Sequence, residues 1–458
     1  MFRHTLMATA LAIAFGVPHC AFAAGDKDLA QIREQIKQMK DDYETRIQAL
    51  EKRLQQAEAK PEQAAAAVAV AAPPPPLPAP APASSNAFNP SVALILGGTY
   101  ANLSQDPSQY RIQGFIPGGG EVGPGKRGLN LGESELTLSA NIDPQFAGQL
   151  TFSLTGENTV SVEESFLQTQ GLSNGLNLKA GRFLSAVGYL NSQHAHAWDF
   201  VDAPLAYQVF FGGQYKVDGV EAKWLAPTER FFELGLEAGS GAVFPGNDRN
   251  KNGIGASALF AHVGDDIGDS ASWRTGLSYL RSSAANRAYV DGDSINAFSG
   301  HSDTWIADAI YKWSPNGNPT NTNFKLQGEY FHRNENGTLS SQAPDTVTGG
   351  YASAQSGWYL QGVYQFMPSW RAGLRYDRLD SGTPNIGLVD SAIRTAADFA
   401  QLASYHPSRS SLMLDYTPSE FSRFRLQFAR DMTRPGAVDN QVFLQYIMSL
   451  GTHGAHTF

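Results

Sequence analysis

The chain has 458 residues, of which 17% are charged and 11% aromatic, and its formal net charge at pH 7 is −9. This acidic balance argues against a nucleic-acid partner, because proteins that bind the phosphate backbone are usually basic. Beyond the N-terminal segment the sequence has no apolar run of about 18 residues or more, which excludes a membrane-spanning helix.

The first 23 residues have the pattern of a secretory signal peptide. A basic start and an apolar stretch over 6–17 precede small residues at Ala21 and Ala23, as at a cleavage site. The single cysteine, Cys20, lies within this segment. We therefore predict that residues 1–23 are removed on export and that the mature chain carries no disulfide bond.

Residues 26–60 have the spacing of a coiled coil. Apolar residues recur at steps of three and four, with one extra step of four between Tyr43 and Ile47. Such a helix is either solitary and solvated or buried against copies of itself, and we expect a homo-oligomer, a trimer or a dimer. Residues 61–88 are rich in alanine and proline, a composition that favours an extended spacer.

From residue 89 to residue 458, apolar and polar residues alternate. Leu136 and Leu138, for example, alternate with Glu135 and Thr137. Period-two alternation predicts strands with one apolar and one polar face. Sixteen segments show it, most of them about 10–13 residues long, the length that a tilted strand needs to cross a bilayer. They are 91–103, 129–141, 146–157, 160–170, 175–184, 216–226, 230–239, 255–264, 271–282, 302–313, 322–334, 355–367, 369–380, 407–417, 421–431 and 439–450.

The connections between these segments alternate in length. The even-numbered connections are short and rich in turn-forming residues, whereas most odd-numbered ones are long: 104–128, 185–215, 240–254, 283–301, 335–354 and 381–406. A soluble β-sandwich has no reason to separate its loops in this way. An even strand count with short turns at one end and long loops at the other predicts an all-β fold, a transmembrane antiparallel barrel of about sixteen strands.

The outward faces and the C-terminal strand agree with a barrel in an outer membrane. Trp305, Tyr311 and Trp313 share one face, and aromatic residues at strand ends are typical of the interfacial girdles of such barrels. The sequence ends on Phe458 after the last predicted strand, and a terminal aromatic of this kind is similar to the assembly signal of outer-membrane barrels. We expect outer-membrane lipid and the barrel assembly machinery as partners.

Two sets of charged residues are predicted to face the lumen from opposite arcs. The acidic set comprises Glu133, Glu135, Glu157, Glu163, Glu233 and Glu237, and the basic set Lys325, Arg371, Arg375, Arg423 and Arg425. If the barrel closes, these arcs create a transverse field across the pore, as in diffusion porins. The alternative is that the charges are paired between neighbouring strands. Charged arcs and rings are how pores select ions.

The longest connection, 185–215, is expected to fold into the pore as a constriction or plug. It carries His194, His196, Asp199 and Asp202, and imidazole and carboxylate are ordinary Zn²⁺ ligands. The alternative is that these residues hydrogen-bond within a packed loop. Zinc is the cofactor that this pattern suggests. We see no catalytic triad, phosphate-binding loop or acid–base pair, so we do not expect an enzyme.

Residues 89–458 resemble a proteobacterial family of outer-membrane proteins often labelled porins or zinc-regulated TonB-dependent outer-membrane receptors. The segments LGESELTLSANIDP, NSQHAHAWDFVDAPL and QYIMSLGTHGAH carry the resemblance. There is a looser likeness to phosphate-selective porins and to siderophore porins with N-terminal coiled coils. A TonB-dependent receptor has a folded plug domain and 22 strands, whereas here a coiled coil and a spacer precede sixteen expected strands.

We therefore expect an outer-membrane porin with a periplasmic coiled coil, acting as a passive channel for small polar or charged solutes. An alternative is a specific uptake receptor for zinc or a metal chelate, with His194 and His196 as binding groups. A third interpretation is an anchor that links the outer membrane to peptidoglycan through residues 26–85.

Overall fold

The computed structural model describes Lys37 and residues 90–119, 122–154, 159–292, 294–342 and 345–451. The expected signal peptide, the spacer, Glu157 and Phe458 lie outside these residues, as does the expected coiled coil apart from Lys37. The predictions made for those parts therefore stay predictions. Among the described residues, no helix has the length and apolar character needed to cross a membrane.

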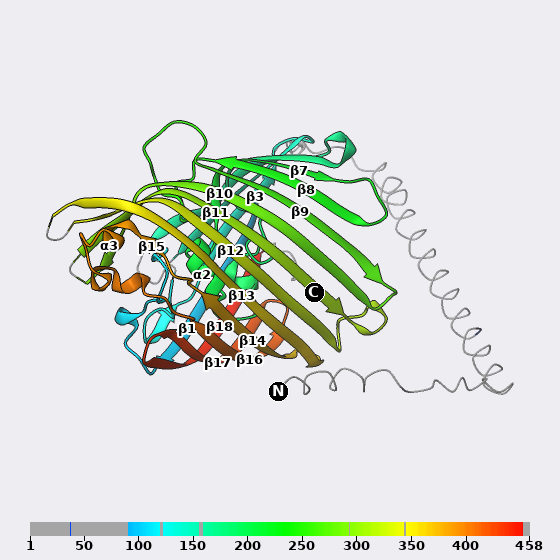
Figure 1. Cartoon of the computed structure of the whole chain (residues 1–458). Coiled ribbons are helices and arrows are strands. Elements are labelled where there is room, and N and C mark those ends of the chain that lie inside the picture. Colours follow the sequence, from blue (N-terminus) through cyan, green and yellow to red (C-terminus); the bar gives the residue numbers. More distant parts are fainter. Residues whose placement is uncertain are drawn as a thin grey trace, which may run out of the picture. The chain divides into compact units, whose positions relative to one another are not determined.

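The strands form a closed antiparallel barrel of sixteen strands (Figure 1). The strands are β1 (Ser91–Leu103), β2 (Gly128–Leu131), β3 (Ser134–Asn141), β4 (Phe146–Leu154), β5 (Val160–Thr169), β6 (Leu176–Leu184), β7 (Lys216–Leu225), β8 (Phe231–Gly239), β9 (Ala256–Ile267), β10 (Ala271–Asp291), β11 (Ser294–Trp313), β12 (Asn323–Ser341), β13 (Val347–Met367), β14 (Trp370–Asp380), β15 (Asn385–Ile386), β16 (Ser408–Ser419), β17 (Ser422–Arg434) and β18 (Ala437–Gly451). The helices are α2 (Leu205–Phe211) and α3 (Gly387–Asp390), with 3-10 turns at Pro107–Gln109, Ser173–Gly175, Ala195–Ala197, Pro315–Gly317 and Ala396–Leu402.

Two of the labelled strands do not add to the wall. β2 and β3 both pair with β1 and together make one wall strand, interrupted at Gly132 and Glu133. β15 is a two-residue bridge on β13, and β14 pairs directly with β16. The barrel closes where β1 pairs with β18 over eleven positions, from Ala93–Gly451 to Leu103–Gln441. The prediction of sixteen wall strands is therefore confirmed.

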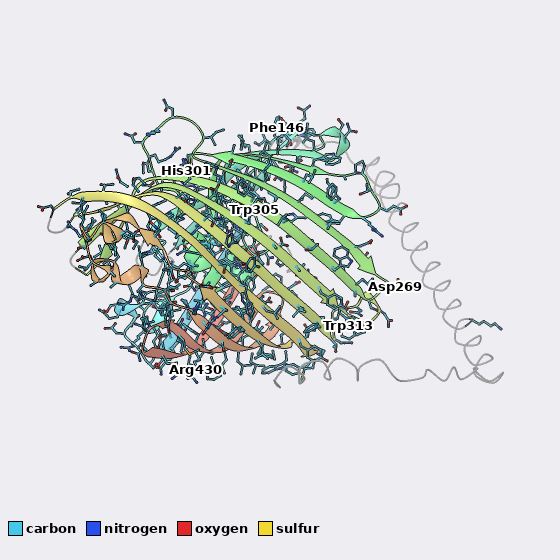
Figure 2. The ribbon with its side chains drawn as sticks, viewed as in Figure 1. Phe146, Asp269, His301, Trp305, Trp313 and Arg430 are labelled. Atoms are coloured by element: carbon cyan, nitrogen blue, oxygen red, sulfur yellow. The ribbon has the colours of Figure 1, made fainter. Side chains whose placement is uncertain are left out.

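An apolar band covers the outside of the wall. Every wall strand exposes at least one large apolar side chain, and aromatic pairs join neighbouring strands, such as Tyr279 with Trp305 and Trp370 with Tyr416 at centroid distances of 4.8 and 4.7 Å. Trp305 and Trp313 lie eight residues apart on β11, near its middle and at its end by the short turn (Figure 2). At about 3.3 Å per residue they are about 26 Å apart, comparable to the apolar band of membrane barrels.

Four strands extend further than the sequence predicts. β10 to β13 have 21, 20, 19 and 21 residues, so the loops expected at 283–301 and 335–354 are mostly strand. Next to Trp305 the outward side chains of β11, Asp303 and His301, are polar, and Asp303 accepts a hydrogen bond from the hydroxyl of Tyr279 at 2.5 Å. The ladder hydrogen bonds need no apolar residue, so the strands continue where the alternation that reveals them has stopped.

The interior of the barrel is packed with the chain's own connections. One apolar cluster joins Ile112, Phe115 and most of the apolar residues of 183–217 to the inner faces of β9 to β14. All seven residues of α2 are buried, and this helix contacts β12, β13 and β14. A second cluster joins the extended strands, through residues such as Phe298 and Tyr351, to Leu388 and Phe399 of the connection before β16. The lumen is much narrower than an empty sixteen-stranded barrel.

The outward band predicts where the wall meets lipid. We expect Ala309→Arg, which places a charge midway between Trp305 and Trp313, to destabilise the barrel by about 2–4 kcal/mol in lipid vesicles. Asn336→Arg, on the outward polar part of β12, is the matched control and should change stability by less than about 1 kcal/mol. Urea unfolding of both variants measures the difference. Equal losses would contradict the position of the band.

Candidate functional site

The connection between β6 and β7, residues 185–215, lies inside the barrel and is held there by charged side chains of the wall. Its first part is held through its backbone N–H groups. Glu164 accepts a hydrogen bond from the N–H of Leu184 at 3.0 Å, and Glu237 accepts one from Ala186 at 2.8 Å. Buried N–H groups need acceptors, and carboxylates make the stronger, charge-assisted bonds.

Glu329 on β12 anchors the next residues of the same segment. Its two carboxylate oxygens accept hydrogen bonds from the N–H groups of Tyr189 and Leu190, both at 3.0 Å. The hydroxyl groups of Tyr207 and Tyr359 also donate to this carboxylate, at distances from 2.6 to 3.0 Å. One buried wall carboxylate therefore fixes both the start of the loop and the helix α2.

The second part of the loop faces the basic wall through Asp199. Its carboxylate contacts the Nζ of Lys325 at 2.6 Å and the guanidinium of Arg371 at 3.3 Å. Burial alone would raise the pKa of Asp199, but the charges of Lys325 and Arg371 lower it below its usual value of 3.8.

Asp202 makes the same kind of contact further along β14 and β16. It contacts Arg375 and Arg409, both at 2.7 Å, and Gln427 donates to it at 3.0 Å. The charges of these arginines outweigh burial and lower the pKa of Asp202. Wall arginines also donate to loop carbonyls, as Arg425 does to Trp198 at 2.9 Å. Wall carboxylates thus bind N–H groups of the loop, and wall lysine and arginine side chains bind its carbonyls and carboxylates.

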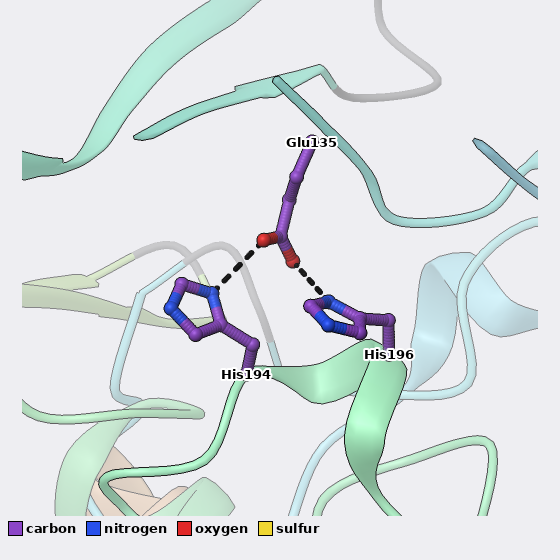
Figure 3. Close-up of side chains that lie close together, drawn as sticks. All are labelled: Glu135, His194 and His196. Carbon is purple, nitrogen blue, oxygen red and sulfur yellow. Dashed lines mark hydrogen bonds and ion pairs between the residues drawn. The ribbon is translucent and has the colours of Figure 1, made fainter. Parts of the chain in front are cut away.

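His194 and His196 point toward the acidic side of the wall (Figure 3). Nδ1 of His194 lies 3.0 Å from Glu135, and Nδ1 of His196 lies 2.8 Å from the other oxygen of the same carboxylate. Nε2 of His194 lies 3.0 Å from Glu164. Burial alone lowers the pKa of His194, but its hydrogen bonds with Glu135, Glu163 and Glu164 raise it well above 6.5.

Two β-bulges aim the acidic side chains into this cluster. In β5, Thr151 pairs with Glu164 and the next residue, Phe152, pairs with Val162, so Glu163 is an extra residue. Both glutamates are therefore buried on the inner side, although neighbouring strand residues normally face opposite sides. The second irregularity is at Gly132 and Glu133, where the pairing partner of β1 changes from β2 to β3. Glu164 was missed in the sequence because strict alternation places it outside.

A cavity of about 410 Å³ lies beside this cluster, between the loop and the inner wall. The wall side is formed by residues of β1, β2, β4, β5, β7 and β18 and by Gly132 and Glu133, and the loop side by residues between 195 and 214. Charged residues of both signs line it: Glu133, Glu163, Asp202, Lys126 and Lys216. We take this cavity as the candidate constriction of a channel.

The described members of both predicted arcs face the interior, but an open lumen does not separate the arcs. The segment from His194 to Asp202 lies between them and pairs with both. Glu233 pairs with His262 at 3.0 Å, Arg423 donates to the carbonyl of His196, and Arg425 pairs with Asp415 at 2.8 Å. The interior charges mostly fix the loop.

The four predicted metal-binding residues do not form one site. His194 and His196 meet glutamates of β3 and β5, whereas Asp199 and Asp202 are ion-paired with lysine and arginine. The structure does not bring the predicted His–His–Asp–Asp set together, because lysine and arginine side chains of the wall contact both aspartates.

No protein-family model matches the chain. A protein of Aquifex aeolicus (strain VF5), described as uncharacterized, is 28% identical over 403 residues, which covers 82% of this chain and 81% of that protein. Among solved structures, a loop-deletion mutant of OmpT, an outer membrane protein of Vibrio cholerae, is similar with a TM-score of 0.50 and 12% identity, covering 79% of this chain and 99% of that one. In-vitro folded OmpT also gives 0.50, at 11% identity, with 79% and 97% covered. These likenesses show the fold.

The arginine contacts predict that Asp202 is a strong anchor of the loop. We expect Asp202→Asn to lower the free energy of unfolding by about 3–5 kcal/mol, because it leaves Arg375 and Arg409 buried without their main counter-charge. Asp218→Asn removes the half-exposed pair with Arg182 and should lower it by no more than about 1 kcal/mol. Urea denaturation of the refolded proteins tests this, and similar losses in both variants would contradict the anchor.

The effect of Asp202→Asn should also depend on pH. Because the folded-state pKa of Asp202 lies below 3.8, ionised Asp202 contributes its full stability above pH 3.8 and loses it as the pH falls through the folded-state pKa. Urea midpoints of the wild-type protein and the variant should differ equally at pH 7 and pH 5. The difference should shrink only in stronger acid. A difference that vanishes already at pH 5 would show that Asp202 is not held by the arginines.

Proposed function

We propose that this protein is an outer-membrane porin, a passive channel for small polar or charged solutes. The observation that carries the proposal is a charged cavity inside a closed sixteen-stranded barrel, beside a loop that folds inward. A continuous apolar band outside and charged groups inside are the distribution expected of a wall between lipid and water.

The dimensions and charges of the cavity support a general class of solute. Its volume of about 410 Å³ is in the range of small-molecule pockets, about 300–1,000 Å³. Glu133 and Glu163 face Lys126 and Lys216 around its lining, so a solute would meet charges of both signs. This arrangement supports passage of small, polar or charged molecules rather than apolar or bulky ones.

Location and mode of action follow from the same features. The similarity to OmpT, described as an outer membrane protein, supports placement in the outer membrane together with the outward apolar band. Many of the described interior charges contact the loop, which supports a role in shaping a channel. Residues 26–60 and Phe458 would add self-association and assembly into the membrane, as the sequence suggests.

The carboxylate–histidine cluster favours a second candidate, a specific uptake channel for zinc or a metal chelate. The family that residues 89–458 resemble is often labelled a zinc-regulated receptor, and that label implies this function. Saturable uptake that depends on His194 would favour it, whereas ohmic conductance independent of His194 would favour the general channel.

A residue that fills the cavity should reduce conductance. Ser153 lines it from β4, directly across from Glu135 in the strand pairing. We expect Ser153→Trp to lower single-channel conductance in planar bilayers to half or less. The control is Leu150→Trp on the outward face of β4, which should leave conductance unchanged. An unaltered conductance in Ser153→Trp would place the solute path elsewhere, and a silent wild-type protein would count against the channel itself.

A further inference from the structure

We infer that Glu135, Glu163, His194 and His196 bind one divalent transition-metal ion, for which Zn²⁺ is the best match. The inference deepens the proposed channel function, because Glu163 and His196 also line the cavity taken as its constriction. The ion would join the inward loop, which supplies both histidines, to β3 and β5, which supply the glutamates.

The donor atoms already converge. Nδ1 of His194 lies 3.0 Å from Glu135 and 3.5 Å from Oε2 of Glu163, and Nδ1 of His196 lies 2.8 Å from Glu135. In a tetrahedral zinc site with bonds of about 2.0–2.2 Å, ligand atoms are about 3.3–3.6 Å apart. Ligand atoms of Glu135, His194 and His196 lie within 4.8 Å of one another, and Glu163 joins this group through its 3.5 Å contact with His194. Figure 3 shows both rings turned toward the same carboxylate.

One carboxylate oxygen that could bind the ion is buried without a hydrogen bond. Glu163 is 2% exposed, and its Oε2 accepts no hydrogen bond of good geometry, with Nδ1 of His194 3.5 Å away and itself 3.0 Å from Glu135. A buried carboxylate oxygen without a donor is unfavourable, and such an atom in a native structure needs an explanation. A cation between Glu163 and His194 would give this oxygen a partner.

The surroundings of His194 match those of a metal-binding histidine. Its Nε2 lies 3.0 Å from Glu164, which is itself fixed by the N–H of Leu184 and the side-chain amide of Gln149, both at 3.0 Å. An acceptor on one ring nitrogen selects the tautomer whose other nitrogen is free to ligate, and such carboxylate–histidine–metal arrangements are usual in zinc sites. Here Glu164 accepts a hydrogen bond from the protonated Nε2, and Nδ1 is left to bind the ion.

Charge and ligand type indicate the class of ion. Glu133, Glu135 and Glu163 bring carboxylate oxygens within 4.8 Å of one another, and Lys216 is 3.5 Å from Glu163. This excess of negative charge favours a divalent cation. Two imidazole ligands favour Zn²⁺, Ni²⁺ or Cu²⁺ over Ca²⁺ and Mg²⁺, which prefer all-oxygen sites.

The simpler account of the cluster is that protonated imidazoles pair with the glutamates and only hold the loop. The two accounts predict different effects of added metal. In the first, an ion replaces the protons, fixes the loop to β3 and β5, and adds positive charge beside the cavity. In the second, added metal finds no site and leaves the channel unchanged.

The decisive experiment is metal binding by the refolded full-length protein. After treatment with a chelator, the protein would be dialysed against Zn²⁺ with excess Ca²⁺, and bound zinc measured by mass spectrometry. We expect one zinc per chain, and a weakening of at least tenfold in His194→Ala and in the isosteric Glu163→Gln. The matched control is His262→Ala, which removes a buried histidine paired with Glu233 on β8. It should bind zinc like the wild-type protein.

Folding, zinc binding and channel conductance are measured in separate experiments. Circular dichroism verifies that each variant is folded, and Co²⁺ in place of Zn²⁺ should give the visible absorption of a tetrahedral nitrogen–oxygen site. No stoichiometric zinc in the wild-type protein, or equal zinc in His194→Ala and His262→Ala, would overturn the site. Conductance recorded without zinc tests the channel alone, so a conducting protein without bound zinc refutes only this inference. A silent protein with one bound zinc refutes only the channel.

Discussion

Ion pairs and hydrogen bonds between the inner wall and residues 184–205 hold the interior of this barrel. Wall side chains alone do not fill the lumen of a barrel this wide, which leaves room for a connection inside it. Once inside, that connection brings backbone groups that need partners. Wall carboxylates such as Glu329 accept from its N–H groups, and wall arginines such as Arg409 donate to its carbonyls. Asp199 and Asp202 neutralise the basic side, and His194 meets the acidic side.

This arrangement explains why a charged interior coexists with a narrow one. The charges that would line an open lumen are mostly engaged with the loop, and the remaining cavity lies where the acidic wall and the loop do not touch closely. Solutes would therefore meet the second part of the loop and the wall from β1 to β5. The electrostatic field in that path depends on which wall charges the loop pairs with. It does not depend on two opposite charged arcs separated by open water.

The two bulges connect the wall to the chemistry of the site. A regular ladder would place Glu163 and Glu164 on opposite faces, one of them in lipid. The extra residue in β5 directs both inward and gives His194 a carboxylate on each ring nitrogen. Irregular pairing at Gly132 and Glu133 occurs in the neighbouring part of the wall. These irregularities in the strand pairing thus place the glutamates of the cluster beside the cavity. Bulges often occur next to functional sites.

The sequence alone determined the class and size of the fold, because alternation over sixteen segments is a local property that each strand carries by itself. It also placed the described wall charges inside and singled out residues 185–215 as the inward connection. It failed where tertiary contacts decide. Nothing in the local sequence indicates that strand pairing continues beyond Trp305 or that a bulge turns Glu164 inward. Nor does it indicate that basic side chains of the wall, rather than a site shared with the histidines, hold Asp199 and Asp202. The partners of Asp199 and Asp202 come from segments more than 100 residues away, and only the closed barrel brings them together.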